Sequence, residues 1–139
     1  MSNYKISSDK DKLDLNVIHD FLTNRSYWAI GRSFETVKRS IENSICFGVY
    51  DSSDKLVGFA RVLTDYAVFA YIMDVFILEE YRKQGLGIQL MDAIMQHSEL
   101  LCLKRIMLAT NDAHELYEKY GFKRTGIPDK IMEIVNKPQ

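Results

Sequence analysis

The residues best suited to chemistry lie at positions 79–87, in the segment EEYRKQGLG. Gly85 and Gly87 lack the Cβ that would block a ligand, so consecutive N–H groups can point into one concavity. An apolar stretch precedes this loop and an amphipathic one follows it, which predicts a strand, a loop and then a helix. The helix start adds unpaired N–H groups and the positive end of its dipole. Such a loop suits a diphosphate, with Arg82 and Lys83 adding charge at the rim.

Two familiar phosphate-binding patterns do not fit this spacing. A P-loop needs GxxxxGK[ST], which the sequence lacks, and a dinucleotide fingerprint needs GxGxxG, whose third glycine is replaced here by Leu90. A glycine pair alone could also be a tight strand-to-helix turn without any ligand. The assignment therefore depends on the residues around the loop.

A second motif, NDAHELYEKYGF, occupies residues 111–122. The first motif, Arg82-x-x-Gly85-x-Gly87, resembles the coenzyme A pyrophosphate signature [Q/R]xxGx[G/A] of the GNAT (Gcn5-related N-acetyltransferase) superfamily. The second resembles that family's A-x-x-[LF]-Y-[EK]-x-x-GF helix. Both stand in the right order and in the expected structural setting. The resemblance is specific over residues 69–122 and extends to residues 1–68 through element order only.

The resemblance implies acetyl-CoA as cosubstrate and a set of residues that hold it. In this family the main chain of the central strand pairs with the pantetheine arm, which here involves Val75, Phe76 and Ile77. The residues implied for the diphosphate are Arg82, Lys83, Gln84, Gly85, Leu86 and Gly87. Asn111 would contact the coenzyme, and Tyr117 would lie near the thioester sulfur and protonate the departing thiolate.

The amine acceptor needs a group that handles its proton, because a free alkylamine has a pKa of about 10.4. Many family members carry a glutamate early on the central strand, where this sequence has Tyr71; the acid on this strand is Asp74. A carboxylate in an apolar run is costly unless it has a partner or a task. We predict Asp74 as the base or as an anchor for the substrate ammonium; the alternative is a structural pairing with Arg61 or a tyrosine.

Strand alternation alone would put Asp74 on the same face as Ile72. In this family the central strand carries a β-bulge near its coenzyme-binding end, which would re-aim Asp74 towards the acceptor. The acceptor pocket is expected from Trp28, Arg32, Phe69 and Tyr71, although each could instead serve packing. Arg32 could meet a carboxylate on the acceptor.

Hydrophobic patterning predicts one α/β (α+β) domain over residues 1–139. Helices are expected around 13–22, after Ser33, after Gly85 and from Asp112 to Gly121, and strands at 45–50, 56–63, 67–78 and 105–109. The tail from Phe122 to Val135 is expected to supply one or two final strands. The resemblance implies a GNAT-type mixed, mostly antiparallel sheet with splayed parallel central strands and helices on both faces.

Composition limits the partners. The 139 residues include 18 basic and 19 acidic side chains, and a net charge of −1 gives no basic field for nucleic acid. We expect no membrane segment and a cytoplasmic location. No metal site is expected, because the three histidines are scattered along the sequence. The two cysteines, Cys46 and Cys102, are expected to be buried and reduced.

The sequence therefore predicts an N-acetyltransferase that moves acetyl from acetyl-CoA to a primary amine, favouring a small molecule, by direct attack in a ternary complex. Two alternatives stay open: acetylation of a protein lysine or N-terminus, and a non-catalytic acyl-CoA-binding module. Dimers are common in the family, so a homodimer is also open.

Overall fold

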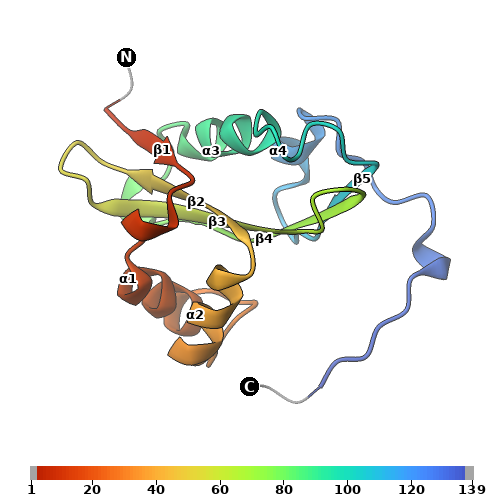
Figure 1. Cartoon of the computed structure of the whole chain (residues 1–139), viewed down its shortest axis with the longest axis horizontal. Helices are drawn as coiled ribbons and strands as arrows, with labels where there is room; N and C mark the ends of the chain where they lie inside the picture. The colour runs from red at the N-terminus through yellow and green to blue at the C-terminus, as the bar shows by residue number, and fades with distance from the viewer. Residues whose placement is uncertain (1–2, 137–139) are drawn as a thin grey trace.

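The computed structural model describes residues 3–136, and Figure 1 shows a sheet between two layers of helices. Its five strands are β1 (Lys5–Ser7), β2 (Ile45–Tyr50), β3 (Leu56–Thr64), β4 (Phe69–Ile77) and β5 (Arg105–Leu108), adjacent in that order. The first three pairings are antiparallel, and β4 pairs with β5 in parallel. The predicted mixed, mostly antiparallel sheet is confirmed.

Each face of the sheet has its own helices and its own core. One face packs on α1 (Leu15–Asp20), the π-helical turn η2 (Phe21–Arg25) and α2 (Phe34–Glu42). The other packs on α3 (Leu86–Met95) and α4 (His114–Glu118). Along β2, Phe47 and Val49 belong to the core under α3, whereas Cys46 and Tyr50 belong to the core over α1 and α2. Burial on both faces explains the nearly continuous apolar run of these strands.

A β-bulge in β4 reverses the side-chain alternation at Asp74. Phe59 of β3 pairs with Phe76, and Arg61 with Met73, so β4 holds one more residue than β3 between these pairs. Asp74 has a φ of 55°, in the left-handed region that aspartate tolerates better than most residues. Before the bulge, even-numbered residues such as Ile72 face α3; after it, Phe76 faces α1 and α2. The expectation of a bulge beside Asp74 is confirmed.

β4 and β5 pair only along part of their length. Residues 69–72 of β4 face residues 105–108 of β5, and β4 then continues to Ile77 without a β5 partner. The two parallel strands therefore separate beyond Ile72, which leaves one edge of β4 open. The single turn η3 (Glu79–Tyr81) and the glycine loop follow directly.

Two expectations about the C-terminal part and the cysteines are wrong. Residues 122–136 form no strand in the described chain: their one regular element is the short 3₁₀ turn η4 (Pro128–Lys130), and no neighbouring strand pairs with them. Cys46 is buried and free, and burial raises the pKa of its thiol to about 11, but Cys102 is exposed rather than buried. Cys102 lies in the turn region before β5, outside both cores.

Candidate active site

A large hollow lies where β4 and β5 separate. It has a volume of about 670 Å³. Its floor is formed by Met73–Phe76 on the open edge of β4. Its far wall is formed by residues 108–113, at and beyond the end of β5, together with Tyr117 of α4. The loop between η2 and α2 closes the third side with Tyr27, Trp28 and Arg32. The sheet therefore supplies free main-chain groups to a cavity with aromatic and charged walls.

Asp74 lines this cavity and accepts hydrogen bonds from three side chains. Its side chain is 1% exposed. One carboxylate oxygen accepts from the Trp28 indole at 2.9 Å; the other accepts from Arg32 at 2.8 Å and from Arg61 at 2.9 Å. The alternative of a pairing with Arg61, left open by the sequence, is present in the structure. Both oxygens already accept ordered hydrogen bonds, so the carboxylate holds the Trp28, Arg32 and Arg61 side chains in place.

Arg61 and Arg32 hold Asp74 from opposite sides. Arg61 is buried and also donates to the Ser44 hydroxyl at 3.1 Å. Arg32 keeps 20% of its side chain exposed and lines the cavity. Because one carboxylate cannot neutralise two guanidinium groups, the cluster carries a net positive charge, and Arg32 presents that charge to the cavity.

The loop that carries Trp28 and Arg32 is fixed in place by local hydrogen bonds. The Ser26 hydroxyl donates to the Leu22 carbonyl at 2.7 Å and accepts from the Ala29 N–H at 3.0 Å. The Gly31 N–H donates to the Thr23 carbonyl at 3.1 Å, and Gly31 has a φ of 80°, which suits glycine. The segment between η2 and α2 is therefore an ordered loop that brings the Trp28 and Arg32 side chains to Asp74.

Tyr117 is 9% exposed and lines the cavity from α4. Its ring packs edge-on against Phe122, with centroids 6.1 Å apart. Burial, followed by the nearby Tyr27 and Asp112, raises the pKa of the Tyr117 phenol, so the phenol stays protonated at neutral pH. A buried, protonated phenol facing a cavity is suited to donating a proton.

The glycine loop adopts the geometry expected of an anion-binding turn. Gly85 precedes α3 with a φ of 78°, and Lys83 has a φ of 67°. α3 begins at Leu86, so the first-turn N–H groups of the helix have no partner within it. Arg82 folds back so that its Nε donates to the Ile77 carbonyl at 2.9 Å, and Arg82 also lines the cavity. Arg82 thus links the loop to the open end of β4.

The structure brings together most, but not all, of the residues predicted from sequence. The lining of the cavity includes Trp28, Arg32, Tyr71, Asp74, Val75, Phe76, Arg82, Asn111 and Tyr117. Phe69, at the start of β4, is 37% exposed and is not part of this lining. Ile77 and residues 83–87 lie beyond the lining, in the strand end and loop that lead out of it. Gln84 accepts a hydrogen bond from the Tyr4 hydroxyl at 3.0 Å.

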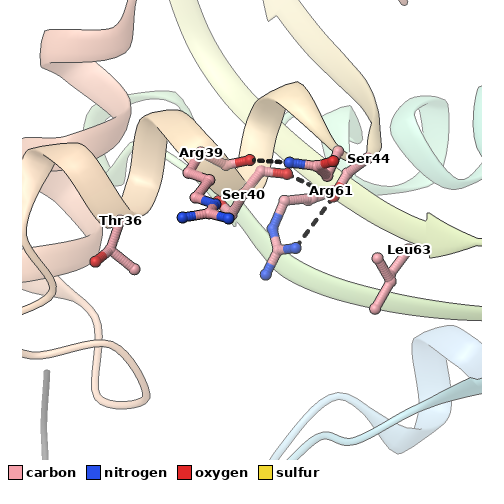
Figure 2. Close-up of a pocket in the computed structure, with 7 residues that line it drawn as sticks. Thr36, Arg39, Ser40, Ser44, Arg61 and Leu63 are labelled. Carbon is pink, nitrogen blue, oxygen red and sulfur yellow. Dashed lines mark hydrogen bonds between the residues drawn. The ribbon is translucent and has the colours of Figure 1, made fainter.

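Sequence reasoning missed two features of the site. Arg25 lines the cavity but is paired with Asp20 and Glu79 at 3.2 and 2.8 Å, which holds the loop beside the glycine turn. Arg61 also borders a second hollow of about 400 Å³, lined by Thr36, Arg39, Ser40, Asn43, Ser44, Arg61 and Leu63. Figure 2 shows Arg61 and Leu63 on the strand facing the α2 side chains, with the Arg61–Ser44 contact drawn.

The described residues hold no group of three or more histidine, cysteine or acidic side chains arranged for a metal ion. In the part of the chain covered by the structure, no helix is long and apolar enough to cross a membrane.

Comparison with known proteins agrees with this geometry. Residues 42–124 match the family described as acetyltransferase (GNAT) domain. A crystal structure of a GNAT-family protein from Xanthomonas campestris pv. campestris is 43% identical and superposes with a TM-score of 0.94 over 99% of this chain and 96% of that one. That coverage takes in the segment that follows α4. A Gibberella zeae protein assigned as an acetyltransferase is 29% identical, covering 84% of this chain and 77% of its own.

A GNAT-family acetyltransferase from Elizabethkingia anophelis, solved with acetyl-CoA bound, shares the fold at 18% identity, with a TM-score of 0.67 over 96% of this chain and 90% of that one. The separated parallel strands, the glycine loop and the family match define a GNAT-type acetyltransferase. The chain belongs to the GNAT acetyltransferase family.

Proposed function

We propose that this protein transfers an acetyl group from acetyl-CoA to the primary amine of a small molecule that also carries an anionic group. The observation that carries the proposal is the open edge of β4 beyond Ile72, which faces a cavity together with Tyr117. An extended pantetheine arm fits along such an edge as an added strand would, by main-chain hydrogen bonds. The solved relative with acetyl-CoA bound supports this choice of ligand.

The diphosphate would be held by the N–H groups around Gly85 and the start of α3, where the left-handed glycine clears the approach. Arg82 adds a cation at the junction of this loop with β4. Acetyl-CoA supplies the acyl group as a thioester, whose C–S bond breaks as the acceptor nitrogen forms the new C–N bond. Main-chain N–H groups at the bulge of β4 would stabilise the charge that develops on the carbonyl oxygen.

Tyr117 is assigned the proton donor to the leaving thiolate sulfur, because its phenol is buried, protonated and faces the cavity. Asp74 is assigned a positioning role in place of the base: with its oxygens held by Trp28, Arg32 and Arg61, it fixes the direction of these groups. The amine proton then leaves towards Tyr71, which lines the same cavity, or towards water held beside it.

The anionic group on the acceptor is proposed from the charge balance. Arg32 donates once to Asp74, and its remaining N–H groups have no partner among the described residues. A guanidinium group that is four-fifths buried and faces a cavity favours a carboxylate or phosphate ligand. Trp28, 39% exposed beside it, offers an aromatic surface for the apolar part of the acceptor.

A thiol-release assay with acetyl-CoA tests both parts of the proposal separately. Amines bearing a carboxylate should be acetylated with a higher kcat/KM than the same amines with a carboxamide. Arg32→Gln should raise KM for the carboxylates by about tenfold, since a hydrogen bond to a charged group contributes roughly 1.5–3 kcal/mol. It should leave the carboxamides unchanged, and Arg32→Lys should be intermediate.

Equal rates for both series would overturn the acceptor class and leave acetyl transfer standing. Acetyl-CoA binding without thiol release on any amine, peptide or protein amine included, would favour the non-catalytic module. Acetylation restricted to peptide lysines or N-termini would favour the protein acetyltransferase.

A further inference from the structure

The second hollow, between α2 and β3, carries positive charge. Its volume is about 400 Å³, and its seven lining residues include Arg39 and Arg61 but no acidic side chain. The two serines of the lining already use their hydroxyl hydrogens, because Ser40 donates to the Val37 carbonyl and Ser44 to the Ser40 carbonyl, both at 2.7 Å. The guanidinium groups are therefore the charged donors that the hollow offers to a ligand.

Both guanidinium groups have donors to spare. Arg61 uses its Nε for Asp74 at 2.9 Å and one Nη for Ser44 at 3.1 Å, and its other Nη has no partner among the described residues. The Arg39 side chain is exposed and makes no hydrogen bond or ion pair with a residue that the structure describes. Figure 2 shows the two guanidinium groups extending to the same side of α2. An anion in the hollow could accept from both.

The second hollow adjoins the active-site cavity on the same face of the sheet. Across the β3–β4 pair, Arg61 lies opposite Met73 and Leu63 lies opposite Tyr71. Ile72, between the two residues of β4, belongs to the core under α3, so Tyr71 and Met73 point to the face that α2 covers. Tyr71 and Met73 line the active-site cavity, whereas their partners on β3 line the second hollow. A ligand in the cavity therefore reaches the hollow by crossing one strand pair.

The arginines of the two hollows are also close to one another. Arg32, in the cavity, and Arg61, in the second hollow, donate to the same oxygen of Asp74 at 2.8 and 2.9 Å. Their donor atoms are therefore no farther apart than the sum of these two distances. Asp74 is the one acidic partner that Arg32, Arg39 and Arg61 have among the described residues. Three guanidinium groups with one carboxylate leave two positive charges unbalanced, so an anion on Arg32 alone does not neutralise the group.

We infer that the acceptor carries two carboxylates, one bound by Arg32 in the cavity and the other bound in the second hollow by Arg39 and the open Nη of Arg61. This inference rests on the proposed function and specifies its acceptor as a short aminodicarboxylate. The planar fork of a guanidinium group suits a carboxylate, and two such groups converge on the hollow. Leu63, which is 46% exposed, offers an apolar surface to the carbon chain that joins the two carboxylates.

A thiol-release assay with matched pairs of acceptors tests the second carboxylate. The pairs are aspartate with asparagine, glutamate with glutamine, and 2-aminoadipate with its 6-carboxamide, so that only the charge of the distal group changes within a pair. At least one diacid should have a KM about threefold to fivefold lower than its carboxamide, as expected for a partly exposed ion pair. Arg39→Gln should abolish that preference. Lys38→Gln should keep it, because Lys38 is exposed on the same helix but does not line the hollow.

A binding measurement gives the same comparison without turnover. Trp28 is the one tryptophan of the sequence, and its indole donates to Asp74 beside Arg32, so its fluorescence reports on the acceptor end of the cavity. Titration of the full chain should show a saturable change with a lower Kd for the preferred diacid than for its carboxamide. The difference in Kd should disappear in Arg39→Gln and persist in Lys38→Gln.

The outcomes separate this inference from the proposed function. Acetylation of other amines without a preference for any diacid would overturn the second carboxylate and leave acetyl transfer standing. If no amine is acetylated, the proposed function fails, and the fluorescence titration decides whether the hollow binds a second carboxylate. Equal affinities within every pair, or a preference that Arg39→Gln retains, would overturn the inference in either case.

Discussion

Replacing Asp74 by asparagine should lower stability far more than it changes the chemistry of the reaction. Asparagine keeps the shape of aspartate and tolerates the left-handed φ of 55° at this position. It cannot, however, satisfy the three donors around it. If the asparagine oxygen faces Arg32 and Arg61, the asparagine N–H₂ faces the Trp28 indole N–H. If the side chain is turned the other way, the N–H₂ faces the two guanidinium groups. Either orientation opposes donor to donor.

The size of the effect follows from burial. Arg61 is 8% exposed in its side chain and, where the asparagine N–H₂ faces it, would keep only Ser44 as a hydrogen-bond partner among the described residues. Breaking a buried ion pair by removing one partner costs about 3–5 kcal/mol. The lower end, about 3 kcal/mol, applies here because Arg32 is 20% exposed and can turn towards water in the cavity. At about 3 °C per kcal/mol for a chain of this size, the melting temperature should fall by about 10 °C.

The assay combines urea unfolding with pH-dependent kinetics. Arg61→Met should also destabilise the protein, and adding Asp74→Asn to it should cost about 1 kcal/mol instead of about 3, which a double-mutant cycle reads as coupling. The residual activity of Asp74→Asn should keep the wild-type pH profile, with KM for the acceptor raised because Arg32 is displaced. An Asp74→Asn protein with wild-type stability and a lost acid limb in its kcat profile would show that Asp74 is the base and that our reasoning is wrong.

Three further predictions test the coenzyme loop, the proton donor and the turn before β4. The Gly87→Val protein should fold, since a Cβ at this position meets only Leu116 at 3.8 Å, yet its affinity for acetyl-CoA in calorimetry should fall by tenfold or more. Gly126→Val, where a Cβ meets open space, is the control and should bind acetyl-CoA normally. Tyr117→Phe should lower kcat by about 10²–10⁴-fold with unchanged coenzyme affinity; an unaltered kcat would remove Tyr117 from the proton transfer. Hydrogen bonds from the N–H groups of Val68, Ala67 and Phe69 lower the pKa of Asp65 to about 2, so its stabilising effect is present above the unfolded pKa and fades as pH falls from about 4 to 2. Asp65→Ala should therefore melt below wild type at neutral pH and converge with it in that window.

Much of the fold could be predicted because local patterns and buried faces agree. The central strand was expected at 67–78 and runs over Phe69–Ile77, and the helix after the glycine loop runs over Leu86–Met95. The helix expected from Asp112 to Gly121 is shorter: α4 runs over His114–Glu118, and the N–H of Ala113 before it donates to the Thr110 hydroxyl. The tail was predicted to be a strand from its residue types, but a strand also requires a neighbour, and none of the described strands pairs with residues 122–136.

The candidate site was predictable where a residue acts through its position on one element, as Tyr117 does on α4 and Gly85 does before α3. Asp74 differs because its environment comes from three separate segments. Trp28 and Arg32 arrive from a loop more than forty positions away, and Arg61 arrives from the neighbouring strand. The sequence identified Asp74 as a carboxylate in an apolar strand and Arg61 as one possible partner, but it could not show how many side chains donate hydrogen bonds to Asp74.

The number of side chains that donate to Asp74 determines the net charge next to the cavity. One aspartate at the base of the cavity binds two arginines, of which Arg61 is buried and Arg32 reaches the cavity. If Asp74 existed to remove a proton from the acceptor, two adjacent cations would oppose the approach of an ammonium ion. The same cluster favours an acceptor whose anionic group approaches Arg32 while its amine reaches the open edge of β4. Under the proposed function, the two tasks that the sequence had placed on Asp74 belong to different residues: Arg32 would bind the anionic group of the acceptor, and Asp74 would hold Arg32 in position.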